Sequence, residues 1–141
     1  MSLVALLAAR EKLQNDAALT AFFQTRYGKP ARHIIGYKSP QNVNDCPVMC
    51  YVPVLYTRAS QVGGWHQERP SIVVGILEAG QDGDVFDGPA QLAELENLIF
   101  DCLESGALGA RSVYLGEGRS VASSIRHPIY EAELKMLLGW R

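Results

Sequence analysis

Cysteine and histidine give this chain its most distinctive chemistry, because thiolate and imidazole side chains bind zinc. Cys46 and Cys50 are four positions apart, and the other four candidates are dispersed: Cys102, His33, His66 and His127. Structural zinc sites bring four ligands together and usually start from closely spaced cysteine pairs. The chain has one such pair, and unpaired cysteine is common in protein cores. The sequence therefore predicts reduced thiols, as in a cytosolic protein, with no metal site and no cofactor.

Two other segments contain the residue types of ligand sites without the required spacing. Residues 78–87 hold four acids, but counting from Asp82 puts an aromatic residue fifth and an alanine twelfth, where a calcium loop needs oxygen ligands. Residues 116–120 read GEGRS and lack the Gly-Lys-Ser/Thr of a phosphate loop. The serines before His127 do not form a recognisable nucleophile elbow. We therefore expect a solvated loop and a turn, and no enzymatic activity.

Aromatic and arginine side chains near a predicted hairpin tip indicate a different kind of site. Residues 58–69 are polar, contain Trp65, and connect two apolar strands. Tryptophan and arginine are enriched among the residues that dominate binding interfaces. The alternative is that Trp65 folds back onto its own domain, because tryptophan is mostly buried, and the same question applies to Trp140. The candidate interface residues are Arg58, Trp65, His66, Arg69 and Trp140.

Apolar residues recur at helical spacing in two regions of the chain. The first region is interrupted near its middle, and the second begins near Pro89. Residues 3–13 and 17–27 have apolar side chains at helical intervals. Asp16 is a suitable N-cap for the second piece, and Gly28 is a suitable end. The later helix begins at Pro89, whose missing N–H would be unpaired at the first helical position.

Strand patterns occur five times in the remaining sequence. Pro53 cannot donate to a sheet ladder, so its strand should lie at an edge or contain a bulge. Residues 71–77 are apolar on both faces, which predicts a central strand. Ile129–Trp140 alternates apolar and polar residues, which favours a strand although its residue types also form helices. The predicted strands are residues 31–37, 48–56, 71–77, 112–115 and 129–140.

Composition and element order together predict the fold class. The chain has 141 residues, 48% of them hydrophobic, which suits one domain over residues 1–141. The order predicts an α+β fold, with a mainly antiparallel sheet of about four to five strands, two main helices packed on it and a protruding β-hairpin. A net charge of −2 argues against general nucleic-acid or polybasic membrane binding. We expect no membrane span and no signal peptide.

The whole arrangement resembles bacteriophage tail terminator and tail completion proteins, the lambda-like group found at the head-proximal end of long tails. The resemblance lies in an Ala/Leu-rich opening helix with a polar break, residues 8–19, and in the strand RPSIVVG, residues 69–75. It continues through a Gly/Asp loop, residues 80–88, that leads into a helix. The chain then closes with HPIYEAEL, residues 127–134, and an aromatic-tipped strand. Residues 116–124 have no counterpart in this resemblance.

The resemblance implies a structural assembly protein with no active site. Subunits would form a ring, expected to be a hexamer, that caps the tail tube, stops its polymerisation and joins the head. The implied partners are further copies of the chain, the tail tube protein and a head completion or connector protein, with DNA passing through the lumen without sequence-specific binding. The implied location is the virion tail, after assembly in the bacterial cytoplasm. The alternatives are a head–tail connector or neck protein, or a small cytosolic enzyme or ligand-binding module using Cys46, His66 or the acidic loop.

Overall fold

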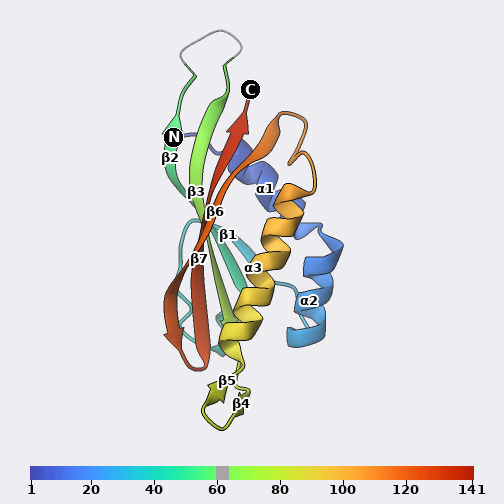
Figure 1. The fold of residues 1–141 in the computed structure, drawn as a ribbon, viewed down its shortest axis with the longest axis vertical. Coiled ribbons are helices and arrows are strands. Elements are labelled where there is room, and N and C mark those ends of the chain that lie inside the picture. Colours follow the sequence, from blue (N-terminus) through green and yellow to red (C-terminus); the bar gives the residue numbers. More distant parts are fainter. Residues whose placement is uncertain (60–63) are drawn as a thin grey trace.

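The computed structural model describes residues 1–59 and 64–141, which form a sheet layer and a helix layer (Figure 1). The helices are α1 (Val4–Gln14), α2 (Ala17–Tyr27) and α3 (Gly88–Glu104), with a short 3-10 helix η1 (Val43–Asp45). The main sheet contains β1 (Arg32–Ile35), β2 (Val48–Thr57), β3 (His66–Leu77), β6 (Ser112–Arg126) and β7 (Ile129–Trp140). A separate small hairpin contains β4 (Gln81–Asp82) and β5 (Val85–Phe86). None of the described helices is long and apolar enough to cross a membrane.

The five strands of the main sheet follow the spatial order β1-β2-β3-β7-β6. β1 runs parallel to β2, and the other neighbouring pairs are antiparallel. The predicted α+β class with a mainly antiparallel sheet is therefore confirmed. Residues 71–77 lie in β3 at the centre of the sheet, as their apolar pattern predicts. Ile129–Trp140 is strand β7, because alternate side chains of this segment complete the core beside β3 and outweigh its helix propensity.

Local signals at the helix ends are also confirmed. The Asp16 carboxylate accepts a hydrogen bond of 2.9 Å from the backbone N–H of Leu19, which caps α2. Gly28 follows α2 with a φ of 69°, a left-handed conformation that glycine adopts without a steric penalty. Pro89 lies in the first turn of α3. The predicted break in the first helical region separates α1 from α2.

Pro53 lies at an irregularity of β2, as its missing N–H predicts. The register between β2 and β3 shifts between Val52 and Leu55, which marks a bulge at the proline. On the other side of β2, pairing with β1 ends at Tyr51. The proline therefore lies both at a bulge and at a free strand edge.

The hairpin formed by β2 and β3 extends beyond the helices, as predicted (Figure 1). The strands pair as far as Thr57 and Gln67, so the connection is shorter than the predicted residues 58–69. The prediction that Arg69 belongs to the connection is wrong, because Arg69 lies within β3 opposite Leu55. Residues 60–63, part of the predicted tip, lie outside the described residues.

Residues 116–120, for which we expected a turn, instead lie in the 15-residue strand β6, as does the rest of the Gly/Ser-rich segment up to residue 124. Pairing with β7 continues through them, interrupted by three register shifts. Gly116 and Glu117 have φ values of 96° and 57°, so the local backbone is turn-like although the strand continues. A Cβ on Gly118 would lie 2.8 Å from the Phe100 ring of α3, which explains the glycine there. The turn signals are real, and they mark bulges in a strand.

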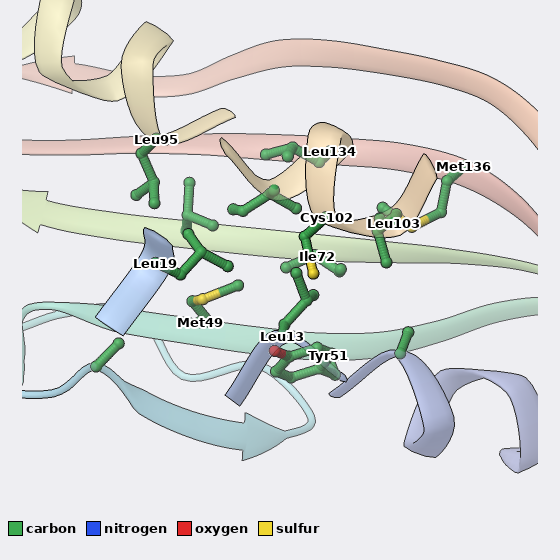
Figure 2. Close-up of a cluster of buried hydrophobic side chains, with 14 of the residues drawn as sticks. Leu13, Leu19, Met49, Tyr51, Ile72, Leu95, Cys102, Leu103, Leu134 and Met136 are labelled. Carbon is green, nitrogen blue, oxygen red and sulfur yellow. The ribbon is translucent and has the colours of Figure 1, made fainter. Parts of the chain in front are cut away.

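The main core lies between the sheet and the three helices (Figure 2). Leu13, Leu95 and Leu103 of the helices meet Ile72 and Leu134 of the central strands. All five side chains are at most 1% exposed. Burying side chains of this size contributes roughly 1.5–3 kcal/mol each, so this layer supplies most of the apolar burial of the sheet.

The opposite face of the sheet, which we call the outer face, is covered differently. At one end, residues 36–47 lie over it. The Tyr37 hydroxyl donates to Glu131 at 3.1 Å, and a Cβ on Gly75 would lie 3.1 Å from Pro40. Cys50 is buried beneath this segment, with its thiol directed to the Lys38 carbonyl. Among the described residues, all three α-helices lie on the other face (Figure 1), so the rest of the outer face is open.

A buried carboxylate from the sheet caps the first helix. Leu3, at the N-cap of α1, has no polar side chain to accept a hydrogen bond. The Glu68 carboxylate, on β3, accepts from the backbone N–H of Ala5 at 3.0 Å and from the Ser2 hydroxyl at 3.5 Å. Glu68 is 3% exposed. Its negative charge at the positive end of the helix dipole joins α1 to the protruding half of the sheet.

We expect Glu68→Ala to lower the free energy of unfolding by about 2 kcal/mol, because the charge-assisted cap is lost and the Ala5 N–H is left without its acceptor. Urea unfolding measures this change. Glu11→Ala is the matched control, since Glu11 is exposed on the same helix, and it should change stability by about 0.5 kcal/mol or less. Equal effects of the two variants would contradict the capping role.

His33, on β1, should make stability depend on pH. Burial, and next the Arg10 guanidinium, lower its pKa from 6.5 to about 4. As the pH falls through this window, the unfolded chain binds the proton first, so the free energy of unfolding should decrease from pH 6.5 toward pH 4. His33→Gln should reduce this dependence in urea unfolding measured at several pH values. An identical pH dependence in both proteins would contradict the assignment.

Candidate interaction surface

An aromatic ladder crosses three strands at the hairpin end of the sheet. The His66 ring stacks on Trp140 with centroids 4.1 Å apart, and on Tyr56 at 5.8 Å. His66 and Trp140 are opposite each other on β3 and β7, and Tyr56 comes from β2. The Tyr56 hydroxyl and His66 Nδ1 lie 2.7 Å apart, and the Arg111 guanidinium lies 5.3 Å from the Trp140 ring. The stacked rings therefore hold β2, β3 and β7 in fixed relative positions at the hairpin end of the sheet.

Trp65 lies on the outer face, opposite its sequence neighbour His66. A Cβ on Gly139 would lie 3.4 Å from the Trp65 ring and 2.7 Å from Leu115, so the glycine makes room for both side chains. The Arg141 guanidinium lies 4.7 Å from the Trp65 ring. Trp65 remains 39% exposed. The ring packs on its own sheet, as one alternative predicts, and still presents a face to solvent, so its role in an interface stays a prediction.

The structure brings together three of the five predicted interface residues. Trp65, His66 and Trp140 converge on one end of the sheet, although on its two different faces. Arg69 lies further along β3 and pairs with Glu117 of β6. Arg58 is exposed just after β2, next to residues that the structure does not describe.

The outer face contains a groove that the sequence did not indicate. The groove has a volume of about 200 Å³, and a second depression of about 260 Å³ shares Val54, Ser71 and Glu133 with it. The Ser71 hydroxyl donates to Glu133 at 2.6 Å. Arg119 of β6 and Lys135 of β7 line the groove. Large apolar side chains on this face are between 39% and 57% exposed: Val54, Leu55, Trp65, Leu115 and Val121. This mixture of apolar and charged groups is typical of binding surfaces.

The three histidines occupy three separate environments, each beside a tyrosine. His33 Nδ1 lies 2.7 Å from the Tyr51 hydroxyl, and His127 Nδ1 lies 2.9 Å from that of Tyr130. His66 has the same relation to Tyr56. Among the described residues, no three His, Cys, Asp or Glu side chains form a group that could hold a metal ion. The imidazoles therefore act here as ring and hydrogen-bond partners within the sheet.

The cysteine thiols are buried within the protein. Burial is the main cause that raises the pKa of Cys46 and of Cys102 to about 11, and it also raises the pKa of Cys50. At neutral pH these groups are protonated, and a protonated thiol is a poor nucleophile. The arrangement gives the alternative of a Cys46-dependent enzyme no support.

A wider depression of about 580 Å³ lies between α2 and α3 on the helix side. Its charged groups contact one another, because Arg26 pairs with Glu94 at 2.6 Å and lies 5.1 Å from the Phe22 ring. The Tyr27 hydroxyl donates to Gln91 at 3.2 Å nearby. These contacts join the two helices, so we interpret the depression as a seam between them.

Searches against protein-family models and curated proteins gave no match. The functional interpretation of the chain therefore rests on its own surfaces. Of these, the outer face and the hairpin end offer exposed apolar groups, charged groups and a stiff backbone in one place. Such a surface is suited to binding another macromolecule.

Alanine substitutions of the two tryptophans should affect stability to different extents. Trp140→Ala should lower the free energy of unfolding by about 3 kcal/mol, because it removes the half-buried ring on which His66 stacks. Trp65→Ala should cost less, about 1 kcal/mol, because the ring keeps 39% of its surface exposed and less of its contact is lost. Urea unfolding checks both values. A loss for Trp65→Ala as large as that for Trp140→Ala would assign Trp65 to the fold alone.

Proposed function

We propose that this chain is a structural assembly protein of a bacteriophage tail, a tail terminator that forms a ring on the end of the tail tube. The observation that carries the proposal is the open outer face, with exposed Val54, Leu55 and Trp65 beside a charged groove. Exposed apolar groups of this number on one face favour burial against another protein. The sequence resemblance to tail terminators supplies the class of assembly.

The shape of the molecule supports a ring over a simple two-fold dimer. A ring of identical subunits needs two different complementary patches on each subunit. Here the sheet layer presents its outer face on one side, and α3 presents a different, acidic surface on the other (Figure 1). Subunits with patches on opposite sides can follow one another around an axis, and a hexamer is the expected number.

The protruding β2–β3 hairpin is a suitable element for contact with the tail tube or with a head completion protein. It extends past the helices (Figure 1), and the ladder of Tyr56, His66 and Trp140 stiffens its base. The paired strands of this base lose little conformational freedom on binding, which favours affinity. In this proposal DNA passes through the ring without being read, and the protein resides in the virion tail after assembly in the host cytoplasm.

Native mass spectrometry of the purified chain, together with electron microscopy of tail tubes grown with and without it, tests this function. We expect a closed ring and tubes that stop growing once the protein caps them. Leu55→Asp, on the outer face, should abolish ring formation, whereas Val85→Asp should not, because Val85 is 67% exposed on β5 away from that face. A chain that stays monomeric and leaves tube length unchanged would contradict the proposal. Binding to heads without an effect on tube length would favour a neck protein.

A further inference from the structure

Two cations stand directly opposite each other on the outer face. Arg119 of β6 and Lys135 of β7 are register partners, and both are exposed. Like charges at directly opposed positions of neighbouring strands repel each other. Neither forms an ion pair with a described residue. Two acids of the same groove make their contacts within it, since Glu117 pairs with Arg69 and Glu133 accepts from Ser71, so the three cations Arg69, Arg119 and Lys135 exceed the acids of the groove by one.

An excess of negative charge lies in the segment that contains α3, and four of its acids belong to this helix. Residues 70–110 contain eight Asp and Glu residues and no Lys or Arg, whereas the rest of the chain contains thirteen Lys and Arg and seven acids. Asp101 and Glu104 are exposed in the last turn of α3, which has no basic residue. Acids at this end of a helix oppose its dipole. Neither has an ion-pair partner in the described part of the chain.

The two unfavourable arrangements lie back to back. α3 packs on β6 and β7 from the helix side, while Arg119 and Lys135 project from the same two strands on the outer side. We propose that Asp101 and Glu104 of one copy dock on Arg119 and Lys135 of the next. Each contact places the acids of one copy against the opposed cations of the next, which relieves both unfavourable arrangements. A copy bound through its acids still has its cations free for the next copy, so the contact repeats head to tail until the ring closes.

This inference rests on the proposed ring and names the surfaces that build it. It accounts for the directly opposed cations Arg119 and Lys135, which form no ion pair among the described residues. In dilute, unassembled protein, Lys135→Thr and the pair Asp101→Asn/Glu104→Gln should each raise the midpoint of thermal unfolding by about 1–3 °C, because each removes a repulsion. The same variants should weaken assembly. If these residues do not form the contact, the substitutions should not both raise the unfolding midpoint of the subunit and weaken assembly.

A charge exchange between subunits tests the proposal. Variant S carries Arg119→Glu and Lys135→Glu, and variant H carries Asp101→Lys and Glu104→Lys. Each alone should be monomeric in native mass spectrometry, because its two patches then have the same sign. An equimolar mixture should restore the ring, with S and H alternating. Lys29→Glu/Lys38→Glu matches the net charge of S at exposed positions elsewhere and should assemble like the unmodified chain.

Several outcomes would overturn the contact: assembly of S or H alone, no ring in the mixture, or no self-association of the unmodified chain. Loss of tube binding in S without loss of self-association would make the tube protein the occupant and would also overturn it. Circular dichroism of S and H establishes that each is folded. Tube capping is scored separately, so restored rings that fail to stop tube growth would leave the contact standing and refute the terminator function.

Discussion

The sheet of this protein is covered on one face, and much of the molecule follows from that constraint. Five strands present two faces, and the three helices pack on the same one. Residues 36–47 cover one end of the other face, with Cys50 buried beneath them. The remaining outer face keeps exposed apolar side chains beside charged ones. An antiparallel sheet can leave one face in water, but exposed apolar side chains of this number make the open face a suitable place for a partner.

Two internal features keep that open face in a fixed shape. Glu68 joins the first turn of α1 to β3, and the stack of His66 between Tyr56 and Trp140 joins the three strands beyond it. Both lie on the helix side, so they support the outer face without occupying it. Gly139 then allows Trp65 to lie flat on the outer side of the same strands. The protein thus separates the groups that stabilise the hairpin end from those that remain available for contact.

Local sequence patterns predicted the parts of this fold that depend on local chemistry. The cap at Asp16, the bulge at Pro53 and the alternation of Ile129–Trp140 each act through neighbouring residues, and the structure agrees with each. Residues 116–120 were predicted as a turn, because their glycines report local backbone shape and carry no information about pairing with β7. That error concealed the groove. Without a strand through residue 119, nothing in the sequence places Arg119 opposite Lys135.

In the candidate site too, local sequence indicates the residue types, whereas strand pairing decides where they lie. Trp65, His66 and Trp140 are recognisable by type, but their distribution over two faces depends on the register of β3 with β7. The burial of the thiols and the separation of the three histidines likewise follow from the fold, and no group of three potential metal ligands occurs among the described residues. What remains is a surface on which Arg119 and Lys135 lie directly opposite each other, the arrangement on which we base the proposed contact between copies.

Electron cryomicroscopy of the assembled chain tests this account most directly. The account predicts a closed ring in which the last turn of α3 of each copy, with Asp101 and Glu104, lies against Arg119 and Lys135 on the outer face of its neighbour. A ring whose subunits meet through other surfaces, with the outer face left open to solvent, would contradict it.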